Sequence, residues 1–229
     1  MTLQRATVTG AGLRFDAADG LSRALRDGCF LLAMPAGFDP GPGITLCREF
    51  HRAPNEGPAA TRAYRGFKDV PGIYFDREHF QTEHVLIDGP GRTRHFPREL
   101  LAMAEQMSSL THLVLRDAMT ELGIAPALWS EITGGAVDGL GTHWFAANHY
   151  RPERAKLGCA PHKDTGFVTV LYNEEPGLEA SVGGARAPGR PPPAPPPPRR
   201  GPPRAPPRPP PPRPVARPGA FPVRCHGLC

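Results

Sequence analysis

Apolar residues recur with a helical period between Phe96 and Gly123. The positions that follow a spacing close to 3.6 residues are Leu100, Met103, Met107, Leu110, Val114 and Met119. Side chains at this spacing share one face of a helix, and Gly123 stands where a helix C-cap is expected. The sequence therefore predicts one long helix whose apolar face, methionines included, packs into the core.

Shorter patterns predict further elements on both sides of this helix. Residues 21–26 fit a short amphipathic helix, followed by a turn at Asp27-Gly28 and a strand over residues 29–34. After Gly139 the segments "THWFAANHY" and "FVTVLY" are rich in aromatic and β-branched residues, which favour strands. Helices first and strands afterwards predict a mostly β fold, a barrel or sandwich of sheets supported by the long helix.

The composition changes abruptly after Gly184. Nineteen of the 31 prolines lie between Pro188 and Pro222, and the only large apolar residues beyond Val182 are Val215, Phe221, Val223 and Leu228. Proline cannot donate to a strand ladder, and so little apolar area does not offset the entropy of ordering. We therefore expect a globular domain over residues 1–184 and a disordered Pro/Arg-rich tail over residues 185–229.

The balance of acidic and basic residues changes near the same position. Nine of the 27 Lys and Arg residues, but none of the 22 Asp and Glu residues, follow Glu179. The preceding part therefore has 22 acidic against 18 basic residues, and the basic character of the chain belongs to the tail. We expect the tail to contact nucleic acid only non-specifically, through phosphate charge.

The remaining composition predicts a cytoplasmic protein. The five cysteines are odd in number and scattered, which is typical of a reduced compartment. The first residues, "MTLQRATVTGAG", lack an apolar leader, and no run of 18 apolar residues occurs. No contact with a membrane is expected.

His162 and Asp164 form the candidate chemical motif. On a strand, residues two apart point to one face, so an imidazole nitrogen and a carboxylate oxygen can bind one ion together. A second histidine from another strand would complete the 2-His-1-carboxylate set that holds iron(II) and leaves open positions for other ligands. The bare motif is weak evidence, because about 0.4 occurrences are expected by chance in a chain of this composition.

The surroundings of the motif are more specific. The chain reads Asn148-His149-Tyr150-Arg151-Pro152, then "HKDTGFVTVL" from His162, then Gly177-Leu178-Glu179. This series resembles Asn-Tyr-Tyr-Pro, His-x-Asp-x-Gly-x-x-Thr-x-Leu and Gly-Leu-Gln of the isopenicillin N synthase-like family of iron(II)- and 2-oxoglutarate-dependent oxygenases. "ALRDGCFLLAMPAGF" and "YRGF" resemble two further segments of that family. The resemblance extends over residues 10–182.

The resemblance implies a double-stranded β-helix, or jelly roll, with iron(II) and 2-oxoglutarate as cofactors and ascorbate as reductant. It implies His162 and Asp164 as metal ligands and Tyr150 as a contact to 2-oxoglutarate, although packing on a half-buried strand explains Tyr150 equally well. The implied reaction uses O₂ to hydroxylate, desaturate or cyclise a small molecule. The kinship looks closest to bacterial secondary metabolism, including antibiotic biosynthesis.

Two parts of the family pattern are missing downstream. No serine follows Ser181, so the Arg-x-Ser pair that would bind 2-oxoglutarate is absent. His226 is the only histidine after His162, and the Pro-rich tail predicts no strand to present it as the third ligand. We therefore expect an incomplete jelly roll, whose carboxyl-terminal part is missing or read in a shifted frame.

Two alternatives stay open at this point. The chain could be a non-enzymatic protein, either a catalytically inactive relative or an interaction protein with a basic tail. Among the other histidines, His143 and His149 are near enough in sequence to touch a substrate. The histidines without any partner pattern, expected at the surface or satisfied in the core, are His51, His79, His84, His95 and His112.

Overall fold

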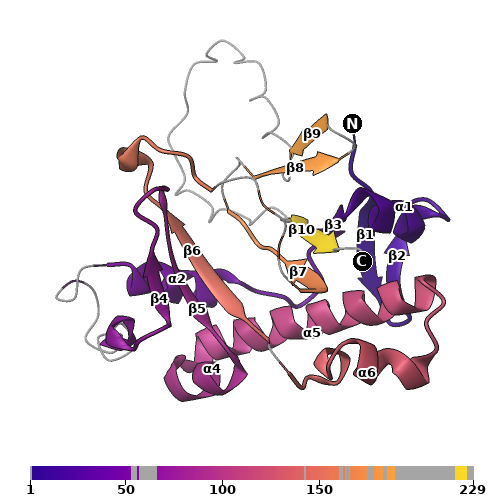
Figure 1. The fold of residues 1–229 in the computed structure, drawn as a ribbon, viewed down its shortest axis with the longest axis horizontal. Helices are drawn as coiled ribbons and strands as arrows, with labels where there is room; N and C mark the ends of the chain where they lie inside the picture. The colour runs from indigo at the N-terminus through magenta and orange to yellow at the C-terminus, as the bar shows by residue number, and fades with distance from the viewer. Residues whose placement is uncertain are drawn as a thin grey trace, which may run out of the picture.

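The computed structural model describes residues 2–52, 56, 66–141, 143–159, 162, 164, 166–174, 178–182, 185–188 and 220–225. These residues form mixed helices and largely antiparallel sheets (Figure 1). One long helix runs beneath two separate sheets, and a third, two-stranded sheet lies above them (Figure 1).

The first sheet has the strand order β2-β1-β3-β10-β7. Its strands are β1 (Arg5–Thr9), β2 (Gly12–Phe15), β3 (Cys29–Ala33), β7 (Val168–Val170) and β10 (Ala220–Cys225). Strands β1 and β3 are parallel, whereas the other neighbours are antiparallel. The sheet thus joins the beginning of the chain to residues from its end.

The second sheet has the order β4-β5-β6 and is antiparallel. Its strands are β4 (Tyr74–Asp76), β5 (Thr82–Ile87) and β6 (Phe145–Tyr150). The third sheet pairs β8 (Glu179–Val182) with β9 (Ala185–Pro188). Because β5 and β6 pair across a long stretch of chain, they bring residues 82–87 against residues 145–150.

The helices enclose one side of the sheets. The α-helices are α1 (Gly20–Asp27), α2 (Gly41–Phe50), α4 (Gly89–His95), α5 (Arg98–Glu121) and α6 (Trp129–Ile132). The 3-10 turns are η2 (Gly66–Asp69), η3 (Pro126–Leu128), η4 (Ala136–Asp138) and η5 (Pro152–Arg154). No helix among the described residues is both long enough and apolar enough to cross a membrane.

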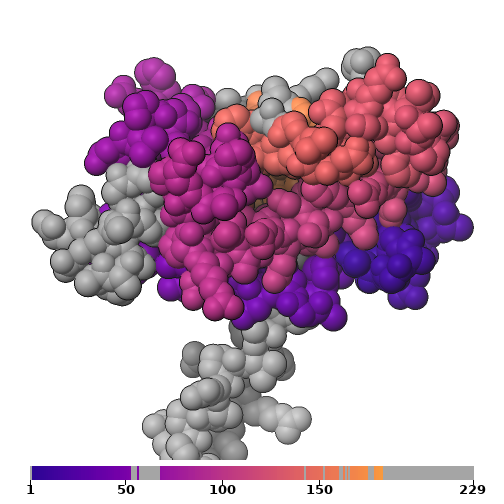
Figure 2. Space-filling model, turned by 90° about the horizontal axis from the view of Figure 1, so that it is seen from below, coloured from indigo at the N-terminus to yellow at the C-terminus, as the bar shows by residue number. Residues whose placement is uncertain are grey.

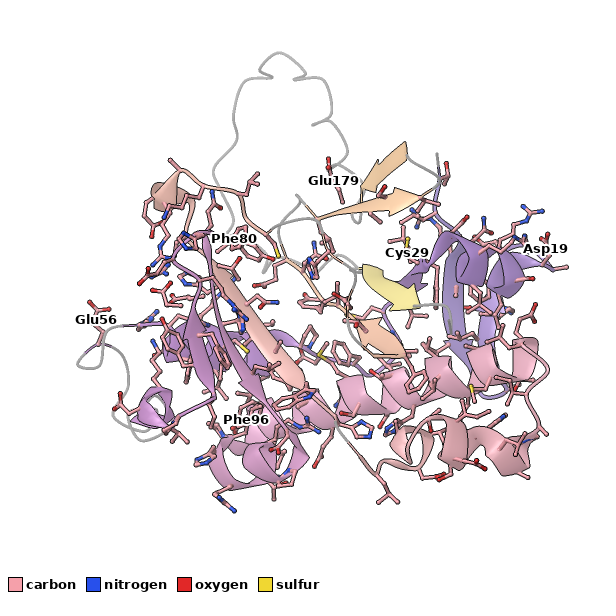
Figure 3. The ribbon with its side chains drawn as sticks, viewed as in Figure 1. Asp19, Cys29, Glu56, Phe80, Phe96 and Glu179 are labelled. Atoms are coloured by element: carbon pink, nitrogen blue, oxygen red, sulfur yellow. The ribbon has the colours of Figure 1, made fainter. Side chains whose placement is uncertain are left out.

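Helix α5 connects the separate parts of the core. Near its start Leu100 and Met103 pack with α2 and the second sheet. Phe96, which is labelled in Figure 3, precedes the helix. Its ring meets that of Phe145 edge to face, with 5.3 Å between the ring centroids. Further along, Leu110 and Val114 pack under the first sheet. Seen from the helical side, α4 and α5 cover the middle of the molecule (Figure 2).

The predicted long helix is confirmed, and so is its buried face. Leu100, Met103, Leu110, Val114 and Met119 are all buried, and Met107 is partly buried between two clusters. Gly123 follows the helix with φ of 69°, a left-handed conformation that glycine adopts without the strain of a Cβ.

The predicted order of helices before strands is wrong. The strands β1 and β2 precede every helix, and β4 and β5 lie before α5. The segments around residues 21–34, 145–150 and 168–170 do form a helix and strands as predicted. The β1–β2 hairpin was missed because its strands are short. Its residues are buried by pairing with β3 and by packing against α5, and neither partner is visible in the local sequence.

The tail differs from the expectation drawn from its composition. Residues 185–188 and 220–225 form β9 and β10, although the proline content predicts no strand there. Strand β10 contains Pro222, but also Phe221 and Val223, two of the few strand-forming residues of the tail. The other residues after Pro188 lie outside the described part of the chain.

Candidate functional site

Strand β6 presents two chemically different faces. Phe145 and Ala147 are buried in the core on the α5 side, and alternation places His149 on the same face. Asn148 and Tyr150 therefore point to the opposite face. Tyr150, a predicted site residue, therefore lies on one side of this strand. His149, which belongs to a cluster of polar residues described below, lies on the other side.

The side chains of His162 and Asp164 lie close together. The Nε2 atom of His162 lies 3.1 Å from Oδ1 of Asp164, so a nitrogen and an oxygen converge on one point. Neither residue lies on a strand, however, because β7 begins only at Val168. The prediction that a strand aligns the two side chains is therefore wrong, and the loop before β7 brings them together instead.

The other ring nitrogen of His162 faces a sulfur atom. Its Nδ1 lies 3.7 Å from Sγ of Cys159, so the Nε2 atom remains directed toward Asp164. The His162 side chain is half exposed and that of Asp164 is mostly buried. The pair is therefore accessible from solvent on the histidine side.

Tyr150 lies beside the segment that leads to this pair. A Cβ placed on Gly158 would stand 3.3 Å from the Tyr150 ring, so the ring packs closely over that backbone. Partial burial and the neighbouring charge of Cys159 raise the pKa of the Tyr150 phenol above its ordinary value. The hydroxyl is therefore protonated near neutral pH and able to donate a hydrogen bond.

The fourth predicted residue, His226, lies outside the described residues. Strand β10 ends at the preceding residue, Cys225, which pairs with Val168 of β7. The argument that no strand can form in this part of the tail is therefore wrong. The backbone brings residues 220–225 alongside the strand that follows Asp164.

A second cluster joins three elements on the α5 side of β6. His51 follows the last residue of α2, Glu83 lies on β5, and His149 lies directly opposite Glu83 on β6. Each offers one ligand atom, and these three atoms lie within 4.8 Å of one another. The group could bind a metal ion.

Both oxygen atoms of the Glu83 carboxylate contact neighbouring side chains. Its Oε1 lies 2.7 Å from Nδ1 of His149 and 3.5 Å from Nδ1 of His51. Its Oε2 accepts a hydrogen bond from the hydroxyl of Tyr74 and lies 3.6 Å from a guanidinium nitrogen of Arg151. Burial raises the pKa of Glu83, but these hydrogen bonds outweigh it, and the net pKa is below its usual range.

His51 differs from the other two members of the cluster. Its side chain is only 5% exposed, and neither ring nitrogen has a hydrogen-bond partner among the described residues. Burial lowers the pKa of His51 to about 4, although the Glu83 carboxylate opposes this effect. His51 is therefore not a surface histidine, and its polar neighbours among the described residues include the Glu83 carboxylate and the His149 ring stacked on it.

A charged network supports the edge of the cluster. Arg154 and Arg151 both donate to Asp76 of β4, at 2.7 Å and 2.5 Å. These two hydrogen bonds, from Arg154 first, hold the pKa of Asp76 well below its ordinary value of 3.8. The network ties the chain after β6 to β4.

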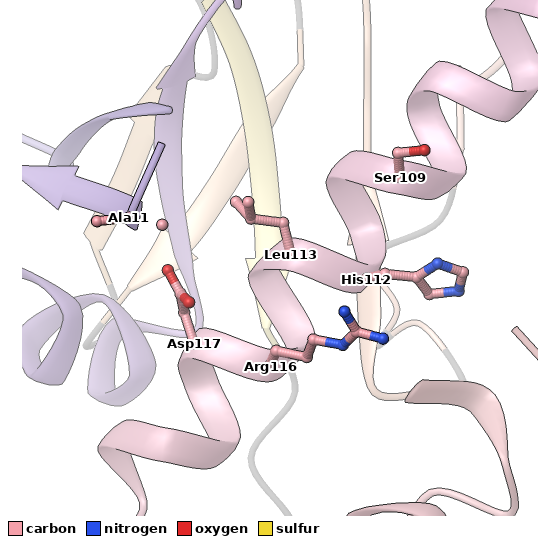
Figure 4. A pocket seen from close by; sticks show the side chains of 7 residues that line it. Ala11, Ser109, His112, Leu113, Arg116 and Asp117 are labelled. Carbon is pink, nitrogen blue, oxygen red and sulfur yellow. The ribbon is translucent and has the colours of Figure 1, made fainter. Parts of the chain in front are cut away.

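A pocket of about 440 Å³ opens elsewhere, between α5 and the β1–β2 hairpin (Figure 4). Three of its polar side chains, Ser109, Arg116 and Asp117, have hydrogen-bond partners, whereas Nε2 of His112 makes no hydrogen bond to the described residues. Asp117 points to the hairpin and accepts from the Leu13 backbone, and Arg116 donates to the Val137 carbonyl. The pocket brings together no set of metal ligands, so we assign the chemistry to the groups around β6.

Sequence reasoning missed Glu83 and His51. Nothing in "QTEHVLID" or "REFHRA" marks either residue, since both patterns fit ordinary strands and helix ends. Only the long-range register of β5 on β6 places Glu83 opposite His149. A sequence signal would have required knowledge of this pairing.

A comparison with curated proteins gives a partial match. Over 62 residues the chain is 39% identical to "2-oxoglutarate-dependent dioxygenase 21, chloroplastic" of Oryza sativa subsp. japonica. The match includes 25% of this chain and only 17% of that protein. No family model matches the chain. Part of the chain is thus similar to a small part of a 2-oxoglutarate-dependent dioxygenase.

Proposed function

We propose that this chain is an iron(II)- and 2-oxoglutarate-dependent dioxygenase that oxidises a small molecule. The observation that carries the proposal is the convergence of His162 Nε2 and Asp164 Oδ1 at 3.1 Å. A neutral imidazole and a carboxylate are the donors that such an iron site requires. The partial similarity to a protein of that name supports the same chemistry.

In this proposal His162 and Asp164 hold the metal and His226 supplies the third ligand. The support for His226 is indirect: β10 ends at the preceding residue, against the strand that follows Asp164. Cys159 orients the His162 ring by facing its Nδ1 atom. The sheets around this loop would then be part of a jelly roll.

The protein's own groups bind and orient the reactants. When bound, iron(II) with 2-oxoglutarate supplies the oxidation of a C–H bond by O₂, coupled to formation of succinate and CO₂. The protonated Tyr150 hydroxyl, next to Gly158 and Cys159, would donate a hydrogen bond to a carboxylate of 2-oxoglutarate. Because no Arg-x-Ser pair follows Ser181, this donor gains importance.

Succinate formation tests the proposal. The purified full chain is incubated with iron(II), ascorbate, 2-oxoglutarate and air, and succinate is measured over time. We expect slow turnover in the wild type and background levels in His162→Ala and Asp164→Ala. His79→Ala, an exposed histidine between β4 and β5, serves as the matched control and should behave as wild type.

The missing Arg-x-Ser pair favours one alternative, a catalytically inactive relative. That alternative predicts no succinate above background from the wild-type chain at any 2-oxoglutarate concentration. Equal succinate formation in the wild type and in His162→Ala would also contradict the proposal. The two results separate an inactive chain from an activity located elsewhere.

A further inference from the structure

We propose that His51, Glu83 and His149 form a second metal site, which binds a divalent transition-metal ion of the zinc class. The site lies on the face of β6 opposite to Tyr150 and does not rest on the proposed dioxygenase function. Two imidazoles and one carboxylate are a donor set that such ions accept, with a fourth position left open.

The first argument is geometric. Zinc binds nitrogen and oxygen ligands at about 2.0–2.2 Å, so tetrahedral ligand atoms stand roughly 3.4 Å apart. His51 Nδ1 and Glu83 Oε1 are already 3.5 Å apart, and the whole set lies within 4.8 Å. His149 is nearly half exposed, so its ring can adjust by the small movement that remains.

The second argument is the unsatisfied histidine. A buried polar atom without a hydrogen bond is uncommon in folded proteins and requires an explanation. His51 has two such atoms, in a side chain only 5% exposed and 3.5 Å from Glu83 Oε1. A metal ion bound to one ring nitrogen would give that nitrogen a partner, because it makes no hydrogen bond to the described residues.

The third argument concerns how Glu83 is oriented. Tyr74 and Arg151 both engage its Oε2 atom, which leaves Oε1 directed at the two histidines. Such outer partners fix the orientation of a ligating carboxylate. Of the two nearby cations, Arg151 also pairs with Asp76, and Lys68 lies over the Phe50 and Tyr74 rings.

The bound ion would connect three elements. It would fix the end of α2, which precedes residues 53–65, to the paired strands β5 and β6. Solvent would reach the ion from the side of His149, whose side chain is nearly half exposed. The ion would therefore exchange with solvent more readily than one in a closed four-ligand site.

The test separates this site from the proposed iron site. A full-length chain with His162→Ala and Asp164→Ala is stripped of metal by a chelator and titrated with Co²⁺, then with Zn²⁺ in competition. We expect one ion per chain, with a visible cobalt spectrum typical of nitrogen and oxygen ligands and no thiolate charge-transfer band. Added Glu83→Gln or His149→Ala should weaken binding by at least about 10-fold, the effect that loss of even an outer partner produces.

The matched control is His84→Gln in the same background. His84 is the neighbour of Glu83 on β5, and its ring packs against Phe75 on the other face. This change should leave the cobalt affinity as it was. Circular dichroism verifies that each variant is folded, and zinc should raise the melting temperature only where the three ligands are intact.

Three results would overturn the second site. They are no cobalt binding by the chain lacking His162 and Asp164, equal affinity with and without Glu83 and His149, or a thiolate band showing that cysteines hold the ion. None of them bears on succinate formation by the wild type, so failure here and failure of the dioxygenase proposal are distinguishable.

Discussion

The carboxylate of Asp117 on α5 accepts a hydrogen bond of 2.6 Å from the backbone N–H of Leu13 in the β1–β2 hairpin. The same carboxylate fills the space above Gly12, where an added Cβ would stand 2.8 Å from Oδ2. One side chain therefore attaches the amino-terminal hairpin to the central helix. The sheet edge that contains β1 and β2 depends on this contact.

We expect Asp117→Ala to destabilise the protein by roughly 1.5–3 kcal/mol, because a hydrogen bond to a charged group is lost and a partly buried N–H is left unpaired. Urea unfolding followed by circular dichroism measures the change. Asp117→Asn keeps an acceptor and should lose less. Glu121→Ala, at an exposed position of the same helix, is the control, and an equal loss there would contradict the assignment.

Gly43 should not tolerate alanine, although alanine favours helices. A Cβ at Gly43 of α2 would lie 2.5 Å from Sδ and 2.8 Å from Cβ of Met103 on α5. Overpacking of this kind costs about 1–3 kcal/mol, which exceeds the gain of about 1 kcal/mol in helix propensity.

A double-mutant cycle measures this clash. Gly43→Ala and Met103→Ala should each destabilise the protein, and the double variant should lose less than the sum of the two. Additive losses would show that the helices do not approach as closely as the structure indicates.

The ion pairs of Asp76 should make the free energy of unfolding fall in acid. Its pKa is depressed in the folded protein by Arg154 and Arg151, so below the ordinary value of 3.8 the unfolded chain binds more protons than the native one. The contribution of Asp76 is therefore complete only above about pH 5, where the unfolded carboxyl is also ionised, and it decreases as the pH falls further. Asp76→Asn should remove this part of the pH dependence.

Urea midpoints measured between about pH 2.5 and pH 6 test the expectation. The curves of wild type and Asp76→Asn should converge toward the acid end. Glu78→Gln, an exposed neighbour, should keep the wild-type curve shape. Parallel curves for wild type and Asp76→Asn would show that the two arginines do not stabilise the ionised carboxylate.

Tyr150→Phe distinguishes a binding role from a packing role. The ring over Gly158 remains, and only the hydroxyl is removed. If the hydroxyl binds a carboxylate of 2-oxoglutarate, the KM for 2-oxoglutarate should rise roughly 12- to 150-fold, which corresponds to one hydrogen bond to a charged group. An unchanged KM together with unchanged stability would leave Tyr150 as a packing residue.

His226→Ala tests the third iron ligand. We expect it to lower iron(II) affinity and succinate formation as strongly as His162→Ala does, since each would remove one ligand of three. Circular dichroism verifies that the sheet with β10 is retained. If His226→Ala binds iron(II) as tightly as the wild type, the third ligand is not His226. The tail would then not complete the site, as its composition predicts.

The sequence alone determined the elements whose patterns are local. The 3.6-residue period and Gly123 were sufficient to predict α5 and its buried face, because both signals arise within one helix. The His-x-Asp motif also singled out His162 and Asp164, whose side chains lie 3.1 Å apart. The strand expected to align them is not observed at either residue, since β7 begins only at Val168.

Only the tertiary structure decided what depends on pairing between distant segments. The register of β5 on β6 places Glu83 opposite His149, and the end of α2 adds His51. Strand β10 exists because β3 and β7 offer it partners on both sides, which outweighs the poor propensity of the tail around it. Strand propensity reflects the neighbours that a strand meets, and those neighbours are absent from any local pattern of residues.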